Sequence, residues 1–250
     1  MPASTVNRVA VVTGASRGIG RAIALRLAAQ GMSVVVGHTG TSPDGPDAPT
    51  VVAAIRDAGG TALGASADVA DESAVARLFA AAREHFGPVD VVVHCAGRMS
   101  LSTIAELDLA ELDALHRTNI RGTFVVAREA ARHVRDGGAI VLLSSSVVGL
   151  QMPTYGAYAA SKGAVEALTM VLAREMRGRD ITVNAVAPGP TATALFMEGK
   201  DEQTVARLAA QPPLGRLGTP EDIADAVAFL TGPDGRWVNG QVLRANGGIV

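Results

Sequence analysis

The feature that most constrains this fold is an apolar segment, a glycine-rich turn and a helical pattern that follow one another within the first 31 residues. Residues 9–12 are apolar and mostly β-branched, as expected for a strand buried on both faces of a parallel sheet. The turn of residues 13–20 follows, and apolar residues at helical spacing continue to Gly31. Glycines let a turn approach a pyrophosphate closely, and the positive N-terminal end of the helix attracts its charge. The sequence therefore predicts a dinucleotide-binding turn made by Gly14, Ser16, Arg17, Gly18, Ile19 and Gly20.

The alternation of strand and helix continues along the chain. The apolar patterns predict further strands at residues 33–36, 61–66, 89–93, 139–143 and 181–187, and helices at residues 50–58, 72–85, 104–115, 119–134 and 158–168. A last helix is expected to begin with Thr219 as its N-cap and Pro220 at its first position. Strands joined by helices form parallel pairs with right-handed crossovers. We therefore expect an α/β protein with one doubly wound parallel sheet, in a single domain of residues 1–250.

The composition excludes several classes of partner. Hydrophobic residues make up 48% of the chain and the formal net charge is −2, so neither nucleic acid nor an acidic membrane surface is expected. A single cysteine, Cys95, fits a reducing compartment, and no apolar run reaches the ~20 residues that a membrane span needs. The histidines show no metal-ligand spacing, so no metal site is expected. We expect a cytoplasmic protein whose partner is a small molecule.

The end of the second strand decides between the two nicotinamide cofactors. NAD sites usually place a carboxylate here for the ribose hydroxyls, but residues 37–40 read Gly-His-Thr-Gly. Nothing here repels a 2′-phosphate, and Arg17 can pair with one. NADP is therefore favoured over NAD, with Arg17 and His38 as candidate contacts. The loop that follows is expected to be mobile, and Asp44 or Asp47 in it keeps NAD open as the alternative.

Tyr158 and Lys162 are the leading candidates for catalytic chemistry. Residues four apart lie on one face of a helix, so the phenol and the ammonium can point into the same cleft. A free tyrosine has a pKa of about 10, and a nearby cation favours the phenolate and lowers that pKa. A tyrosine tuned in this way can give a proton to a carbonyl oxygen, or take one from an alcohol, near neutral pH.

Taken together, these features resemble one known family. The glycine turn, Asn119, the serines at 144–146 and the Tyr158-x-x-x-Lys162 pair resemble the short-chain dehydrogenase/reductase family in its compact single-domain branch. Within that branch the chain is similar to 3-oxoacyl-(acyl-carrier-protein) reductases, and the likeness covers nearly its whole length. The resemblance implies a Rossmann-type sheet of about seven strands. The last strand is expected within residues 240–248, at an interface of a homotetramer.

The resemblance also implies roles for the catalytic candidates. Tyr158 would give its proton to the substrate oxygen, while Lys162 lowers the tyrosine pKa and binds the ribose hydroxyls. The backbone carbonyl of Asn119 would hold a water in contact with Lys162. One serine would orient the substrate oxygen. Counting back from Tyr158 selects Ser145, whereas the local Ser-Val-Val-Gly pattern selects Ser146, which we prefer.

Further contacts follow from the same resemblance. Asp68 and Val69 are expected at the adenine, although Asp68 is equally suited to cap the next helix. Cys95 stands where the family usually has asparagine, and we interpret it as a buried structural residue because no group that would activate a thiol is apparent. Residues 194–213 are expected to form an apolar lid over the substrate, with core packing or a subunit contact as the alternative. The remaining cofactor contacts are expected from Ala96, Gly97, Tyr158, Lys162, Pro188, Gly189, Thr191 and Thr193.

The expected function is the reduction of a ketone or aldehyde by NADPH, similar to that of 3-oxoacyl-thioester reductases. One alternative is an NAD-dependent alcohol dehydrogenase that works in the oxidative direction. The other is a nucleotide-binding regulatory protein without turnover. The complete set of serine, tyrosine, lysine and asparagine argues against the regulatory protein, because binding alone would not require all four. The sequence does not name the substrate.

Overall fold

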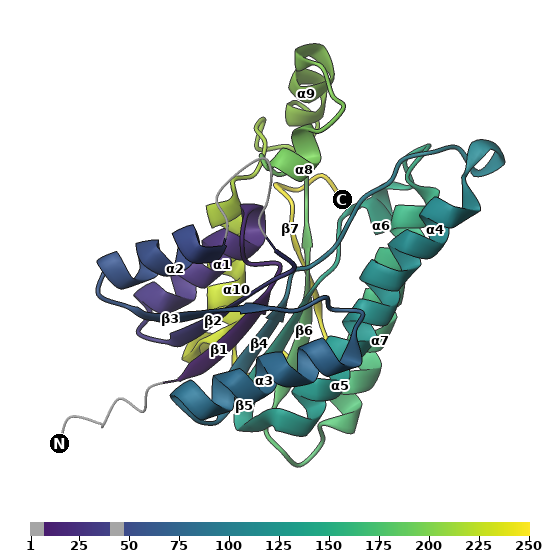
Figure 1. Cartoon of the computed structure of the whole chain (residues 1–250). Coiled ribbons are helices and arrows are strands. Elements are labelled where there is room, and N and C mark those ends of the chain that lie inside the picture. The colour runs from purple at the N-terminus through teal and green to yellow at the C-terminus, as the bar shows by residue number, and fades with distance from the viewer. Residues whose placement is uncertain (1–7, 41–47) are drawn as a thin grey trace.

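The centre of the molecule is a 7-stranded parallel sheet in the order β3-β2-β1-β4-β5-β6-β7 (Figure 1). The structure is a computed structural model and describes residues 8–40 and 48–250. Its strands are β1 (Val9–Thr13), β2 (Ser33–His38), β3 (Thr61–Ser66), β4 (Val89–His94), β5 (Val134–Leu143), β6 (Thr182–Pro188) and β7 (Val242–Ala245). The expected Rossmann-type sheet of about seven strands is confirmed.

Helices cover both faces of this sheet (Figure 1). The first layer consists of α1 (Gly18–Ala29), α2 (Ala48–Asp57) and α10 (Pro220–Thr231), and the second of α3 (Glu72–Phe86), α5 (Gly122–His133) and α7 (Gly156–Glu175). Strand β1 packs against both, because Ala10 and Val12 join the core under the first layer while Val9 and Val11 join the core under the second. The apolar segment at the start of the chain is therefore a strand buried on both faces, as predicted.

Shorter elements connect the layers, and two expected helices differ from the sequence-based expectation. The helix expected over residues 104–115 is interrupted, because Asp108 caps a new helix by accepting from the Ala110 backbone N–H at 2.8 Å. The helix expected to end at Val134 ends one residue earlier, since Val134 instead pairs with Val89 and opens β5. The shorter elements are η1 (Ile104–Glu106), α4 (Leu109–His116), the π-helical turn η2 (Arg117–Arg121), α6 (Val147–Leu150), α8 (Ala194–Met197), α9 (Glu202–Ala209) and η3 (Pro233–Gly235).

The topology places a crevice at the carboxyl ends of the central strands. The chain runs outward from β1 to β3 and then returns to β4 on the other side of β1, so the strand order reverses there. Ligands of such sheets bind outside the carboxyl ends of the strands at this reversal. Here β1, β4 and β5 end at Thr13, His94 and Leu143, and α8 and α9 stand beyond this edge of the sheet (Figure 1).

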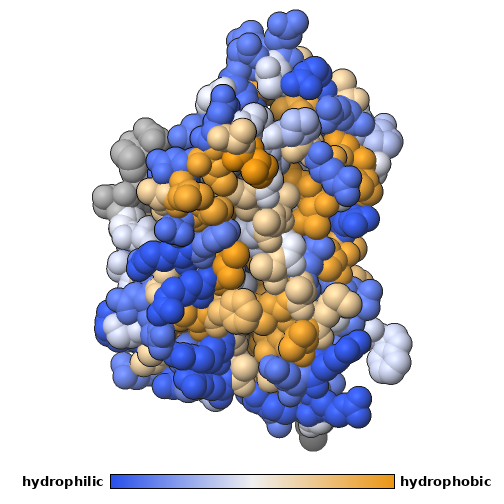
Figure 2. All heavy atoms as spheres, turned by 90° about the vertical axis from the view of Figure 1, so that its right-hand side faces the viewer, coloured by the Kyte–Doolittle hydropathy of each residue, from blue (hydrophilic) through white to orange (hydrophobic). Residues whose placement is uncertain are grey.

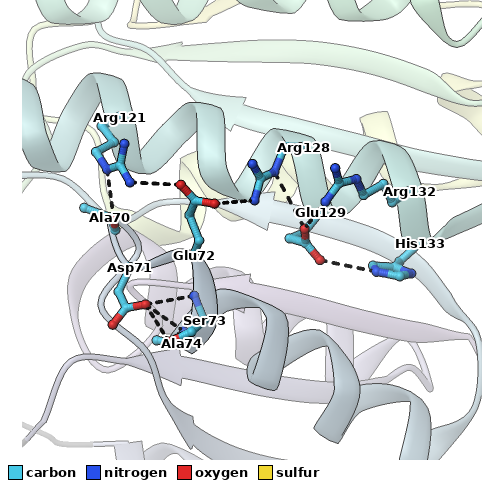
Figure 3. Close-up of polar contacts among 10 residues, drawn as sticks. All are labelled: Ala70, Asp71, Glu72, Ser73, Ala74, Arg121, Arg128, Glu129, Arg132 and His133. Atoms are coloured by element: carbon cyan, nitrogen blue, oxygen red, sulfur yellow. Dashed lines mark hydrogen bonds and ion pairs between the residues drawn. The ribbon is translucent and has the colours of Figure 1, made fainter.

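An ion-pair network ties α3 to α5 on the second face (Figure 3). Glu72, in the first turn of α3, accepts from Arg121 at 3.0 Å and from Arg128 at 2.8 Å. Glu129 is only 5% exposed and pairs with Arg132 at 3.0 Å. A buried carboxylate depends on such partners, because it has lost its hydration. The network therefore fixes α5, which directly follows the turn η2 that carries Asn119.

The start of α10 shows the predicted cap. The Thr219 hydroxyl accepts from the Asp222 backbone N–H at 3.2 Å, and the Asp222 carboxylate accepts from the Thr219 N–H at 2.7 Å. Pro220 occupies the first turn, where its missing N–H costs no hydrogen bond. This reciprocal pair is a capping box, so the start of α10 is set by local sequence.

Candidate active site

The glycine turn after β1 forms a close-fitting cradle. Gly14 and Gly18 have φ values of 64° and 54°, which other residues rarely adopt. A Cβ added to Gly20 would lie 2.2 Å from the Gly14 carbonyl oxygen, and a Cβ added to Gly14 would lie 2.7 Å from the Cα of Ala96. The glycines therefore let β1, α1 and the end of β4 approach one another at the backbone. This geometry fits a pyrophosphate at the N-terminal end of α1.

A cleft runs along this turn. The residues that line it include Gly14, Ser16, Arg17, Gly18, Ile19, Gly20, His38, Asp68, Val69, Ala96 and Gly97. All of these were expected at the cofactor, and the end of β2 contributes His38, Thr39 and Gly40 without a carboxylate. Asp44 and Asp47, which keep NAD open as an alternative, lie outside the described residues.

Asp68 faces a cation that the sequence analysis missed. Its carboxylate accepts from the Ala70 backbone N–H at 2.9 Å, as a turn-capping aspartate does, and from Arg117 at 2.7 Å. Arg117 also lines the cleft, but it is 49 residues away in the chain and no local pattern pairs the two. The rim of the cleft therefore presents an ion pair at this point instead of a carboxylate alone.

A second, mostly apolar cleft joins the first. Its lining includes Ser144, Ser145, Ser146, Tyr158, Lys162, Pro188, Gly189, Thr191 and Thr193. The two clefts share Ile19, Cys95, Gly97, Thr193 and Leu195. Of the expected cofactor contacts, Gly97 and Thr193 therefore lie where the cofactor cleft meets the cleft that contains Tyr158.

Tyr158 and Lys162 share this second cleft, as their spacing on α7 predicts. Lys162 Nζ lies 5.7 Å from the centroid of the Tyr158 ring and donates to the Leu143 carbonyl oxygen at 2.7 Å. Burial lowers the pKa of Lys162 to about 8 and raises the pKa of Tyr158 to about 12, because each charge would lose its hydration. The expected lowering of the tyrosine pKa by Lys162 is not seen in this structure, where loss of hydration is the largest effect on Tyr158 and the Ser145 side chain is the group that opposes it. The phenol stays protonated at neutral pH and can act as an acid.

The structure separates the neighbouring serines. The Ser145 side chain faces Tyr158 and partly opposes the rise in the tyrosine pKa. The Ser146 hydroxyl is 2% exposed, donates to the Ala187 carbonyl oxygen at 3.1 Å and accepts from the Asn246 amide at 2.9 Å. With these partners Ser146 ties the end of β5 to the last residues of the chain. The preference for Ser146 therefore does not fit the geometry, which favours Ser145.

Asn119 is held on three sides. It lies in the π-helical turn η2, a kind of distortion that often marks functional sites, and it is 1% exposed. Its Oδ1 accepts from the Arg98 backbone N–H at 2.9 Å, and its Nδ2 donates to the Arg98 carbonyl oxygen at 2.9 Å and to the Ser161 hydroxyl at 3.0 Å. Its backbone carbonyl accepts from the Thr123 hydroxyl at 2.6 Å. A carbonyl oxygen has two lone pairs, and the Thr123 hydroxyl binds to one of them.

Comparison with known proteins agrees with this arrangement. A family model described as enoyl-(acyl carrier protein) reductase matches residues 14–250. A short-chain type dehydrogenase/reductase of Picea abies is 45% identical over 250 residues, which cover 97% of this chain and 92% of that protein. The chain belongs to the short-chain dehydrogenase/reductase family. The resemblance drawn from the sequence is confirmed, and the protein is an oxidoreductase of this family.

Two further members of the family are close in sequence or structure. An NADPH-dependent aldehyde reductase-like protein, chloroplastic, of Arabidopsis thaliana is 41% identical over 263 residues, which cover 100% of this chain and 96% of that protein. A short-chain dehydrogenase from Burkholderia cenocepacia, solved in complex with NADP, is 37% identical with a TM-score of 0.88, and 98% of each chain is covered. The likeness therefore extends over the whole fold.

This short-chain dehydrogenase/reductase departs from the family pattern at Cys95. Cys95 was expected to be buried, but it is partly exposed where the two clefts meet. Its packed surroundings raise the pKa of the thiol to about 12, which keeps it protonated and fits the expectation that it is not a nucleophile. Across residues 8–40 and 48–250, no group of three or more His, Cys, Asp or Glu side chains is placed to hold a metal ion.

The residue before it, His94, is the main site feature that the sequence analysis missed. The histidines have no metal-ligand spacing, and the sequence predicts no role in the site for His94. It is 2% exposed, with Nδ1 at 2.8 Å from Thr13 Oγ1 and Nε2 at 3.1 Å from Thr123 Oγ1. Thr123 in turn donates to Asn119, so His94 is connected to the candidate site. The only sequence signal is its place directly before Cys95-Ala96-Gly97.

The burial of His94 predicts that acid destabilises the fold. Burial, together with the Lys162 ammonium, lowers the pKa of His94 from 6.5 to about 3. Between these values the unfolded chain binds the proton more tightly than the folded protein. The neutral, buried His94 therefore contributes its full share to the free energy of unfolding above pH 6.5, and this contribution falls as the pH drops toward about 3. At pH 5 the loss amounts to about 2 kcal/mol. Chemical denaturation of the wild type and of His94→Gln near pH 7.5 and near pH 5 measures it, and the variant is expected to be less sensitive by about that amount. Equal pH dependence in both proteins would contradict the prediction.

Proposed function

We propose that this protein reduces an apolar aldehyde or ketone to the alcohol with NADPH. The observation that carries the proposal is that Tyr158, Ser145 and Lys162 line one cleft, and that this cleft shares Gly97 and Thr193 with the cofactor cleft. A protonated phenol and a hydroxyl that converge beside a cofactor cleft form a site for the oxygen of a carbonyl that becomes an alkoxide.

The choice of NADPH rests on both the relatives and the cleft. The Arabidopsis relative is named as NADPH-dependent, and the Burkholderia structure holds NADP. The preference for NADP expected from the sequence is confirmed by these relatives. In this chain Arg17 and His38 line the cleft where β2 ends without a carboxylate, and we assign the 2′-phosphate to them.

Each polar residue of the second cleft is assigned one role in the reduction. Bound NADPH supplies the hydride for the carbonyl carbon. Tyr158 gives its phenolic proton to the oxygen, and Ser145 donates a hydrogen bond that orients it. Lys162 is mostly cationic at neutral pH because its pKa is about 8, so it can balance the phenolate left on Tyr158. We assign the Asn119 carbonyl the role of holding a water that returns the proton by way of Lys162.

The lining of the second cleft supports a neutral, apolar substrate. Lys162 is the only charged side chain among the described residues that line it. The apolar contribution comes from Met99, Val147, Leu150, Met152, Leu195, Phe196, Leu208 and Ile249. Leu195 and Phe196 belong to α8 and Leu208 to α9, so we assign residues 194–213 the role of a lid over the substrate. A 3-oxoacyl thioester is the alternative substrate.

Cofactor titration and a substrate screen test this function together. Nicotinamide fluorescence is followed while purified protein is titrated with NADPH and with NADH. A preference for NADPH of tenfold or more, about 1.4 kcal/mol, is expected. The screen then compares aromatic aldehydes and apolar ketones with a 3-oxoacyl thioester. Preference for NADH would favour the alcohol dehydrogenase, and binding without turnover of any carbonyl would favour the regulatory protein.

The two serines are expected to respond differently to substitution. Ser145→Ala removes the hydroxyl beside Tyr158, so kcat should fall about 10- to 100-fold with little change in melting temperature. Ser146→Ala leaves the buried Asn246 amide without this acceptor, so its main effect should be a loss of stability of about 1–3 kcal/mol. Steady-state kinetics and thermal unfolding of both variants separate the two roles. A larger loss of kcat in Ser146→Ala would reverse the assignment.

We further propose a homotetramer in the cytoplasm. Apolar side chains gather on the face formed by α4, α5 and α7 (Figure 2), where Leu109, Phe124, Met170 and Val171 are exposed. Phe229 on α10 and the 99% exposed Trp237 supply apolar surface elsewhere. Two separate apolar faces suit two kinds of two-fold contact, which together build a tetramer. Sedimentation measures the mass of the assembly and so tests this proposal.

No helix among the described residues is long and apolar enough to cross a membrane.

A further inference from the structure

His94 is buried between two structural elements, and the proposed reaction gives it no role. It is the last residue of β4, and its two ring nitrogens contact threonines of two other elements. Thr13 ends β1 and leads into the glycine turn, while Thr123 lies in the first turn of α5. The ring therefore links the strand that carries the cofactor turn to the helix that follows Asn119.

Hydrogen bonds connect Thr13, His94, Thr123 and Asn119 in series, and the donor in each bond can be derived. The Asn119 carbonyl can only accept, so the Thr123 hydroxyl donates its single proton to it in the 2.6 Å bond. Nε2 of His94 must then donate to Thr123 Oγ1, at 3.1 Å. In a neutral ring Nδ1 consequently accepts, and the Thr13 hydroxyl donates to it at 2.8 Å. Thr13 Oγ1 can still accept from the Ala96 backbone N–H, at 3.5 Å. One tautomer, with the proton on Nε2, satisfies every member.

This series of hydrogen bonds ends at Asn119, which lies next to Gly97 in the lining of the cleft that contains Lys162. The Asn119 amide grips the backbone of Arg98 on both sides and bonds to Ser161, the residue before Lys162. A Cβ added to Gly97 would lie 3.4 Å from Asn119 Oδ1 and 3.6 Å from Lys162 Nζ. Asn119 and Lys162 therefore face the same glycine. A shift of the Asn119 backbone would change the surroundings of the Lys162 ammonium.

We propose that His94, as the neutral Nε2–H tautomer, is a positioning residue that acts through Thr123 to fix the Asn119 carbonyl beside Lys162. His94 touches neither cleft, so its effect is on the orientation of a lone pair and not on contact with substrate. The effect on turnover rests on the proposed function, whereas the tautomer does not.

Two pairs of variants test the positioning role. In His94→Gln the amide nitrogen is attached one atom beyond Cγ, like Nε2, and can still donate to Thr123. In His94→Asn the amide oxygen is attached to Cγ, like Nδ1, and can reach only Thr13. Thr123→Val removes the hydroxyl that joins His94 to Asn119, and Thr123→Ser restores it. We expect kcat to fall about 10- to 100-fold in His94→Asn and Thr123→Val, with the Kd for NADPH changed less than about threefold.

The matched variants separate positioning from general destabilisation. His94→Gln should retain at least about ten times the kcat of His94→Asn, and Thr123→Ser should recover most of the kcat lost in Thr123→Val. The double variant His94→Asn/Thr123→Val should be no slower than the slower single variant, because both break the same chain. Equal kcat in the glutamine and asparagine variants, or additive losses in the double variant, would overturn the proposal.

A measurement without turnover keeps the inference testable if the proposed reaction is wrong. Nitrogen-15 NMR of protein labelled at histidine reports which ring nitrogen carries the proton. His94 is expected to show a protonated Nε2, a bare Nδ1 and no titration between about pH 5 and 9. A proton on Nδ1, or a charged ring in this range, would overturn the proposal whether or not the protein reduces carbonyls. The expected tautomer without any carbonyl reduction would reject the proposed function alone.

Discussion

A Tyr158→Phe variant is expected to reduce its best carbonyl substrate about 10²- to 10⁴-fold more slowly than the wild type, the range that general acid catalysis supplies. The phenyl ring keeps the packing of Tyr158 beside Lys162, whose Nζ lies 5.7 Å from the ring centroid, but has no proton to give. NADPH binding should change less than about threefold, because the glycine turn is untouched. The measurements are kcat at saturating NADPH and the Kd from nicotinamide fluorescence.

Tyr155→Phe is the matched control for this prediction. Tyr155 lies three residues earlier, lines the same cleft, and undergoes the same loss of one hydroxyl. Ser145 acts on Tyr158 and not on Tyr155, so the control should lose less than about tenfold in kcat. A wild-type rate in Tyr158→Phe, or an equal loss in both variants, would show that the proton comes from another group.

Gly20→Ala is expected to weaken NADPH binding by about 100-fold or more, which corresponds to about 2.7 kcal/mol. The added Cβ would lie 2.2 Å from the Gly14 carbonyl oxygen and 3.1 Å from the Cα of Ala15, both backbone atoms that no rotamer change can move. The turn must therefore shift away from α1, and overpacking of this kind also costs about 1–3 kcal/mol of stability. Fluorescence titration and thermal unfolding measure the two effects.

Gly163→Ala provides the control for a glycine-to-alanine change in a helix. Gly163 lies within α7, and a Cβ added there meets no atom within 4 Å. This variant should bind NADPH like the wild type and gain about 0.5–1 kcal/mol of stability from alanine's better helix propensity. Unchanged NADPH binding in Gly20→Ala would mean that the cofactor does not approach the glycine turn.

Much of the fold could be predicted because its signals are local. A strand buried on both faces reads as a continuous apolar run, and a helix repeats its apolar residues about every 3.6 positions. These patterns located the strands at 61–66 and 33–36 and the cap at Thr219, each from a few neighbouring residues. Boundaries were less certain where long-range pairing intervenes, as when Val134 leaves its helix to pair with Val89.

The candidate site was predictable only in part. The glycine turn and the Tyr158–Lys162 pair depend on spacing within one element, and the structure places both at the clefts. The choice between Ser145 and Ser146 depends instead on how the end of β5 turns toward α7. There the geometry favours Ser145, because Ser146 is taken up by Asn246, 100 residues later in the chain.

By itself, the sequence determined the parallel α/β architecture, the dinucleotide turn and the family, because these follow from periodicity and from motifs of a few adjacent residues. Only the tertiary structure decided which serine meets Tyr158, that burial raises the tyrosine pKa, and that His94 connects Thr13 to Asn119. The physical reason is that hydration is lost, and hydrogen-bond partners are chosen, by groups that the fold brings together from distant parts of the chain. His94 and Thr123 are 29 residues apart, and no pattern along the chain encodes their contact.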